Sequence, residues 1–176
     1  MGGGTPSSAD VVRGSPAGRR RAGAIILAKT NMAEFAWHGT YTLSSERGRT
    51  NNPYNQANSA SGSSGGTGAA VAAGYAPAGL GTDPCGSIVG PSAHQSLVGY
   101  RPTMRQTSVT GIVPLSPRQD VSGPMTTTVT DAALLMEVLA GYRTAGGVGG
   151  VPPAPLPRGP AEQSFCGAAC QGDGPC

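Results

Sequence analysis

Large apolar side chains are scarce in this sequence. Only 27 of its 176 residues are Leu, Ile, Val or Phe, whereas Gly and Pro supply 29 and 16. A dense core formed by this chain alone is therefore not expected. The longest apolar runs, such as 24–28, are far too short to span a membrane. That run is also too short and too far from the start for a signal-peptide core, so a cytoplasmic location is the default expectation.

Lysine is nearly missing, since Lys29 is the only one in the chain. The net charge of +3 therefore comes from arginine. The cluster Arg19–Arg21 lies in a Gly/Pro-rich arm without interleaved aromatic residues, which argues against nucleic-acid binding. The four cysteines and two histidines lack the spacing of metal ligands, so we expect neither a metal nor another cofactor.

The chain divides into three zones by composition. Residues 1–22 form a low-complexity arm rich in Gly, Pro and Arg, and residues 143–176 form a Gly/Pro-rich tail that we expect to be disordered. Residues 23–142 carry the regular patterning of a folded region. Only this middle zone is therefore expected to hold a domain.

Short elements are predicted in the first half of that zone. Residues 24–29 favour a buried strand, and Asn31 with Glu34 resembles a capping box at the start of a helix. Residues 40–58 are polar and predict a long loop, whereas residues 65–73 favour a helix of small residues that can pack closely on a neighbouring backbone.

Two further elements are expected in the second half. Residues 80–82 favour a brief strand, and like residues 24–29 it is expected to have an exposed edge. Thr128 and Asp131 suit the start of a helix that ends at Gly141. Its apolar face comprises Ala132, Leu135, Met136 and Leu139.

The Gly/Ser cluster at residues 62–66 permits several interpretations. Alone, such a cluster is most often a turn. It also fits the G-x-S-x-G pattern of a nucleophile elbow, with Asp83 or Asp120 as the acid and His94 as the base. The residues before it are polar, and His94 precedes Asp120, which disfavours that fold. A phosphate-binding loop is disfavoured as well, because no Gly-Lys-Ser/Thr follows.

A more extensive pattern joins two serines, Ser63 and Ser87, which lie 24 positions apart in separate loops of small residues. These two blocks, with others in one fixed order, resemble the amidase signature family, whose serine-serine-lysine hydrolases cleave carboxamides. The resemblance is greatest for the branch that contains the peptide amidases. The matching blocks are 23–35, 52–55, 63–74, 81–88, 99–103, 111–115 and 123–126.

The resemblance implies a role for each matching position. Ser87 corresponds to the nucleophile, and Ser63 corresponds to a serine in a cis peptide bond that relays a proton to a lysine. The backbone N–H groups of Cys85 and Gly86 correspond to the oxyanion hole. Pro84 departs from the family pattern because proline has no N–H to donate.

The resemblance also implies that the chain is truncated. The family's catalytic lysine lies farther upstream than the 62 residues before Ser63, and Lys29 matches a different, non-catalytic lysine. We therefore expect an α/β fold, a mixed sheet flanked by helices, that holds only part of the amidase domain. The expected function is hydrolysis of a small amide through a serine acyl-enzyme, impaired or inactive in this chain. The alternative is a non-catalytic relic that acts as a structural or interaction fragment, and the oligomeric state stays open.

Overall fold

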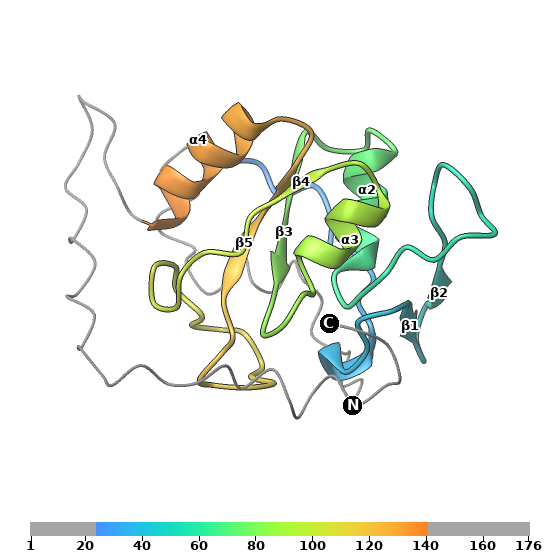
Figure 1. The fold of residues 1–176 in the computed structure, drawn as a ribbon, viewed down its shortest axis with the longest axis horizontal. Helices are drawn as coiled ribbons and strands as arrows, with labels where there is room; N and C mark the ends of the chain where they lie inside the picture. Colours follow the sequence, from blue (N-terminus) through green and yellow to red (C-terminus); the bar gives the residue numbers. More distant parts are fainter. Residues whose placement is uncertain (1–23, 141–176) are drawn as a thin grey trace.

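A small antiparallel sheet lies at the centre of the molecule. The computed structural model describes residues 24–140, so the arm and the tail expected from composition lie outside the described residues. The strand order is β3-β5-β4. In Figure 1, α2 and α3 lie on one side of this sheet and α4 on the other, which gives the expected α/β layering.

The elements follow one another in a simple order along the chain. A short 3-10 turn, η2, and the hairpin β1-β2 precede the central layers. The bounds are η2 Glu34–Ala36, β1 Thr42–Ser44, β2 Gly48–Thr50, α2 Gly65–Ala72, β3 Ala78–Thr82, α3 Val89–His94, β4 Val98–Gly99, β5 Ser122–Thr126 and α4 Val129–Ala140.

The core lies between the sheet and the helices α2 and α3. Ile88 and Met125 are completely buried, and Val71, Leu80 and Val121 are nearly so. Few large side chains are available to fill this core, so the backbones of the helices and strands lie close together instead. Glycines in α2 and in the strands allow that approach, since an added Cβ at Gly79 or Gly81 would contact neighbouring side chains.

The outer edge of β3 is covered, although an exposed edge was expected there. The hydroxyl of Thr67 donates to the carbonyl of Leu80 over 3.1 Å. The hydroxyl of Ser64 accepts from the amide of Thr82 and also donates to its carbonyl. Side chains of α2 and its N-cap thus satisfy backbone groups that an edge strand leaves open.

The predicted strand at residues 24–29 is wrong. These residues are exposed and form no strand, and Ile25 and Leu27 are 85% and 66% exposed. An apolar run becomes a buried strand only when a neighbouring strand pairs with it, and none of the described strands does so.

The predicted capping box is also wrong. Asn31 bonds the hairpin β1-β2 instead: its amide donates to the carbonyl of Gly48 and to the hydroxyl of Thr50, and its oxygen accepts from Ser44. The short turn η2 that follows has no side-chain cap. Asn31 therefore attaches the hairpin that the sequence had suggested to be a loop.

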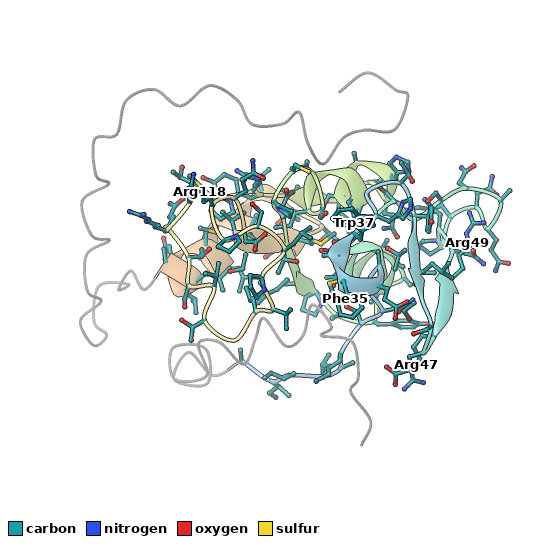
Figure 2. All side chains as sticks on the ribbon, turned by 90° about the horizontal axis from the view of Figure 1, so that it is seen from below. Phe35, Trp37, Arg47, Arg49 and Arg118 are labelled. Carbon is teal, nitrogen blue, oxygen red and sulfur yellow. The ribbon has the colours of Figure 1, made fainter. Side chains whose placement is uncertain are left out.

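The hairpin and η2 carry large exposed side chains near the start of the described chain. Figure 2 shows Phe35 and Trp37 on η2 and its flank, and Arg47 and Arg49 extending from the hairpin. Phe35 and Trp37 are 64% and 74% exposed.

The two predicted helices are confirmed, with bounds shifted by a residue or so. The start of α4 has the expected cap, because the amide of Asp131 donates to the hydroxyl of Thr128 over 3.1 Å. The Thr128 hydroxyl in turn donates to the Asp131 carboxylate. Of the expected apolar face only Ala132 is fully buried. The predicted stop at Gly141 lies outside the described residues.

Gly66 provides a test of the close packing of α2. An added Cβ there would strike backbone atoms of Asn31, which cannot move aside as a side chain can. We expect Gly66→Ala to lower the free energy of unfolding by about 1–3 kcal/mol, although alanine favours a helix by up to about 1 kcal/mol. Gly39→Ala is the matched control because its Cβ would meet nothing within 4 Å. Urea unfolding checks both, and equal stability of the two variants would contradict the packing argument.

Candidate active site

Ser63 lies in a tight, buried loop at the entrance to α2. Its side chain is completely buried, and the peptide bond between Gly62 and Ser63 is cis, as the resemblance implied. The carbonyl of Ser63 accepts from the amide of Ala33 over 3.0 Å and from the hydroxyl of Thr42 over 3.3 Å. Backbone and hairpin groups therefore hold this loop from two sides.

The segment between η2 and β1 packs directly on the same loop. The amide of Gly62 donates to the carbonyl of Gly39 over 2.8 Å. An added Cβ at Gly62 would strike the carbonyls of His38 and Tyr41, whose rings stack with their centroids 3.9 Å apart. Only glycine fits at position 62, which explains the Gly-Ser order at this point of the sequence.

The second serine, Ser87, lies just before α3 in a loop arranged around Asp83. The buried Asp83 carboxylate accepts from the amides of Gly86, Ile88 and Val89, the last two over 2.8 and 3.4 Å. Asp83 thus bonds the backbone of the Ser87 loop. Three amide donors wrapped around one carboxylate fix the loop that presents Ser87.

Arg101 holds the same loop from outside, a role that the sequence had not revealed. Its Nε lies 3.3 Å from the Asp83 carboxylate, and its Nη2 donates to the carbonyls of Pro84 and Gln119 over 3.1 and 3.0 Å. The only signal in the sequence was its place in the block 99–103, which resembles the family pattern. An arginine can bridge a carboxylate and two carbonyls because its guanidinium carries five donors.

The structure brings the two serine loops together. The amide of Ser64 donates to the carbonyl of Ser87 over 3.3 Å. The Ser63 hydroxyl is buried and has no hydrogen-bond partner within residues 24–140, and the Ser87 residue is 5% exposed. No hydrogen bond joins the Ser63 hydroxyl to that of Ser87 among the described residues, although the backbones of the two loops are bonded to each other.

The amides around Ser87 differ in what they can donate to. Gly86 donates to Asp83, and Pro84 has no N–H. In the part of the chain that the structure describes, the amides of Cys85 and Ser87 make no hydrogen bond. The N–H groups of Cys85 and Ser87 are therefore free to accept a new partner, whereas that of Gly86 is engaged. The assignment of the oxyanion hole to Cys85 and Gly86 stays a prediction.

Lys29 makes no hydrogen bond to the Ser63 hydroxyl in the described part of the chain. It is exposed, whereas the Ser63 hydroxyl is completely buried and bonds to nothing within residues 24–140. A side chain at the surface cannot accept a proton from that hydroxyl without a route between them.

The alternative nucleophile elbow gains no support from the geometry. His94 has its Nδ1 3.3 Å from the carbonyl of Ser59, and the carboxylate of Asp120 accepts from the amides of Leu115 and Ser116. Burial raises the pKa of Asp120 above its ordinary value, although those two amide bonds act in the opposite direction. Neither group contacts a serine hydroxyl.

Among the residues that the structure describes, no group of three or more His, Cys, Asp or Glu side chains could hold a metal ion. The helices of this region include none that is long and apolar enough to cross a membrane.

The described residues thus define an α/β protein in which two serine-bearing loops meet beside an Asp–Arg pair. Comparison with known proteins agrees with that scaffold. A model of the family described as Amidase matches residues 17–153, and the chain belongs to this family. The resemblance stated from the sequence is confirmed.

Similar proteins include both amidases and amidotransferase subunits. The chain is 48% identical over 123 residues to a glutamyl-tRNA(Gln) amidotransferase subunit from Corynebacterium jeikeium, a match that covers 70% of this chain and 24% of that protein. A solved peptide amidase from Stenotrophomonas maltophilia matches with TM-score 0.68 and 41% identity over 77% of this chain and 28% of that one. The corresponding amidotransferase subunit from Thermotoga maritima matches with TM-score 0.68 and 40% identity over 76% of this chain and 28% of that one. These structures show the amidase fold, and the chain spans about a quarter of the length of these relatives.

Proposed function

We propose that the chain carries the serine pair of an active site that hydrolyses the C–N bond of a carboxamide. The observation that carries the proposal is the contact between the loops of Ser63 and Ser87, joined by the bond from the Ser64 amide to the Ser87 carbonyl. It brings a buried, unpaired hydroxyl next to a loop that is held rigid by Asp83. A nucleophile and a relay group need that proximity.

The proposed chemistry assigns one step to each group. The Ser87 hydroxyl oxygen attacks the amide carbonyl carbon, and its proton passes to Ser63 and from there to a base. The carbonyl oxygen becomes an oxyanion, which the N–H groups of Cys85 and Ser87 can bind, with Gly86 able to join only by leaving Asp83. When the C–N bond breaks, ammonia leaves with a proton and the acyl group stays on Ser87. Water then releases the carboxylate and restores the serine.

We further propose that this chemistry is impaired in the 176-residue chain. Lys29 is its only lysine and lies at the surface, so Ser63 has no lysine to pass a proton to. Pro84 removes one backbone donor, and Asp83 engages another. The substrate class is a small amide, by analogy with the peptide amidase that the chain is similar to.

A non-catalytic role is the second candidate. It is favoured by the loss of two oxyanion donors, since Pro84 has no N–H and Gly86 donates to Asp83. The exposed apolar residues Ile25 and Leu27 also offer a surface for another polypeptide. The two candidates differ in whether the serine pair works when a lysine is supplied.

A chimera tests this difference. Residues 24–140 replace the corresponding segment of the Stenotrophomonas maltophilia peptide amidase, which is 41% identical over the matched part. That protein supplies the regions that the 176-residue chain does not span. We expect ammonia release from a carboxamide, abolished by Ser87→Ala and lowered by about 10²–10⁴ in Ser63→Ala. Gln56→Ala, in an exposed loop, is the control. A folded chimera whose activity persists in Ser87→Ala would contradict the proposal, and a folded, inactive chimera would favour the non-catalytic role.

A further inference from the structure

Gln95 is a buried polar residue that the proposed chemistry does not use. It follows α3 directly, and its side chain is completely buried. A buried side-chain amide is costly unless it is hydrogen-bonded, at about 1–3 kcal/mol for each unmet group. The presence of glutamine here therefore calls for a functional explanation.

Its side-chain bonds lead to the two ends of the Ser63 loop and to α3. The Nε2 atom lies 3.1 Å from the carbonyl oxygen of Ala60, 3.4 Å from that of Gly65 and 3.2 Å from that of Pro91. Ala60 and Gly65 flank Ser63 on either side, and Pro91 lies in α3, which begins two residues after Ser87. One NH₂ group thus connects both ends of the Ser63 loop to the helix behind Ser87.

The orientation of the amide follows from its surroundings. The Oε1 atom has no hydrogen-bond partner in the described part of the chain. Turning the amide over would place this oxygen against three carbonyl oxygens, so Nε2 must face them. Glutamine suits this position because its amide supplies two N–H donors, although its Oε1 acceptor has no partner among the described residues.

The neighbouring helix α2 has a glycine, Gly68, where it contacts this side chain. An added Cβ at Gly68 of α2 would strike the Gln95 Nε2 atom. Glycine at this point lets α2 approach close enough for the amide to reach the Ser63 loop. The Gln95 amide therefore packs directly on Gly68, which joins the end of α3 to α2.

We propose that Gln95 is a positioning residue that fixes the Ser63 loop against α3 and so sets the separation of Ser63 and Ser87. The catalytic meaning of that separation rests on the proposed function. The positioning itself can be measured without turnover, through the hydrogen bond from the Ser64 amide to the Ser87 carbonyl.

The test follows hydrogen exchange of single amides by NMR in the 176-residue chain. Gln95→Met keeps the length of the side chain but removes its donors. We expect the Ser64 amide to exchange about tenfold faster or more, since about 1.4 kcal/mol of lost protection is a factor of ten. The amide of Tyr100, which donates to the carbonyl of Pro124, serves as the internal reference and should change much less.

Two further variants make the result specific. Gly68→Ala leaves Gln95 in place but displaces its amide, and should produce the same selective change at Ser64. If Gln95→Met does not fold, Gly68→Ala decides by the same comparison. Gln56→Met, on an exposed loop, should change neither amide.

Equal acceleration at Ser64 and Tyr100 would mean only global destabilisation and would overturn the proposal, as would unchanged exchange at Ser64. These results are independent of catalysis. An inactive chimera would remove the proposed function and leave the exchange pattern as expected, whereas unselective exchange would remove the positioning role and leave serine chemistry intact.

Discussion

The 176-residue chain is expected to show no amidase turnover above background with simple primary amides or aryl amides. Loss of a general base typically lowers the rate by about 10²–10⁴, and residues that act as a unit can cost more. Loss of an oxyanion donor, as at Pro84, is worth about 10²–10³ in addition. An assay of released ammonia or aryl amine against time, with the unmodified peptide amidase as positive control, checks this expectation.

Two variants distinguish the ways in which the expectation could fail. Ammonia release that disappears in Ser87→Ala but persists in Lys29→Ala would show serine chemistry without any lysine, and the proposed proton route would be wrong. Loss of activity in both variants would mean that Lys29 serves as the base, in conflict with its exposed position.

The largest effect on stability is expected from Asp83→Ala. The Asp83 side chain is completely buried, accepts from three amides and faces the Arg101 guanidinium at 3.3 Å. Its removal leaves donors without an acceptor and the arginine without its carboxylate. Removing one partner of a buried ion pair costs about 3–5 kcal/mol, and because Arg101 is one-third exposed we expect the lower part of that range.

A surface ion pair supplies the matched control for that variant. Glu46 lies 3.8 Å from Arg47, and their side chains are 55% and 74% exposed. Glu46→Ala should lower the free energy of unfolding by less than about 1 kcal/mol. Urea unfolding of both variants gives the comparison. Similar losses would show that Asp83 does not organise the Ser87 loop.

The parts of the fold that sequence predicted are those determined by local chemistry. The helix at α2 follows from a run of small residues, and α4 follows from the cap formed by Thr128 and Asp131. The strand β3 was recognised from three of its five residues.

The parts that sequence missed depend on distant partners. Residues 24–29 have the composition of a strand but no strand beside them among those described. Asn31 has the spacing of a helix cap, yet the hairpin offers it three hydrogen bonds and competes successfully. The strand β5 contains a glycine and a proline, Gly123 and Pro124, which obscure its place at the centre of the sheet.

The candidate site shows the same division. The two serines were found because their loops resemble a family pattern, whereas Arg101 and Gln95 were not singled out. Their contacts join segments far apart in the sequence: Arg101 reaches Pro84 and Gln119, and Gln95 reaches Ala60. No local pattern shows which distant groups such residues bind, and only the folded backbone reveals which carbonyls they meet.

The most direct test of the central claim, that Ser63 and Ser87 form a hydrolytic pair with Ser87 as the nucleophile, is to identify the residue that reacts covalently with a serine-directed reagent. The chimera is treated with a serine-directed fluorophosphonate, digested and analysed by mass spectrometry. We predict one adduct, on the peptide that carries Ser87, which is lost in Ser87→Ala and formed much more slowly in Ser63→Ala. An adduct on Ser63 or Cys85 instead, or labelling of Ser87 at an unchanged rate in Ser63→Ala, would contradict the claim.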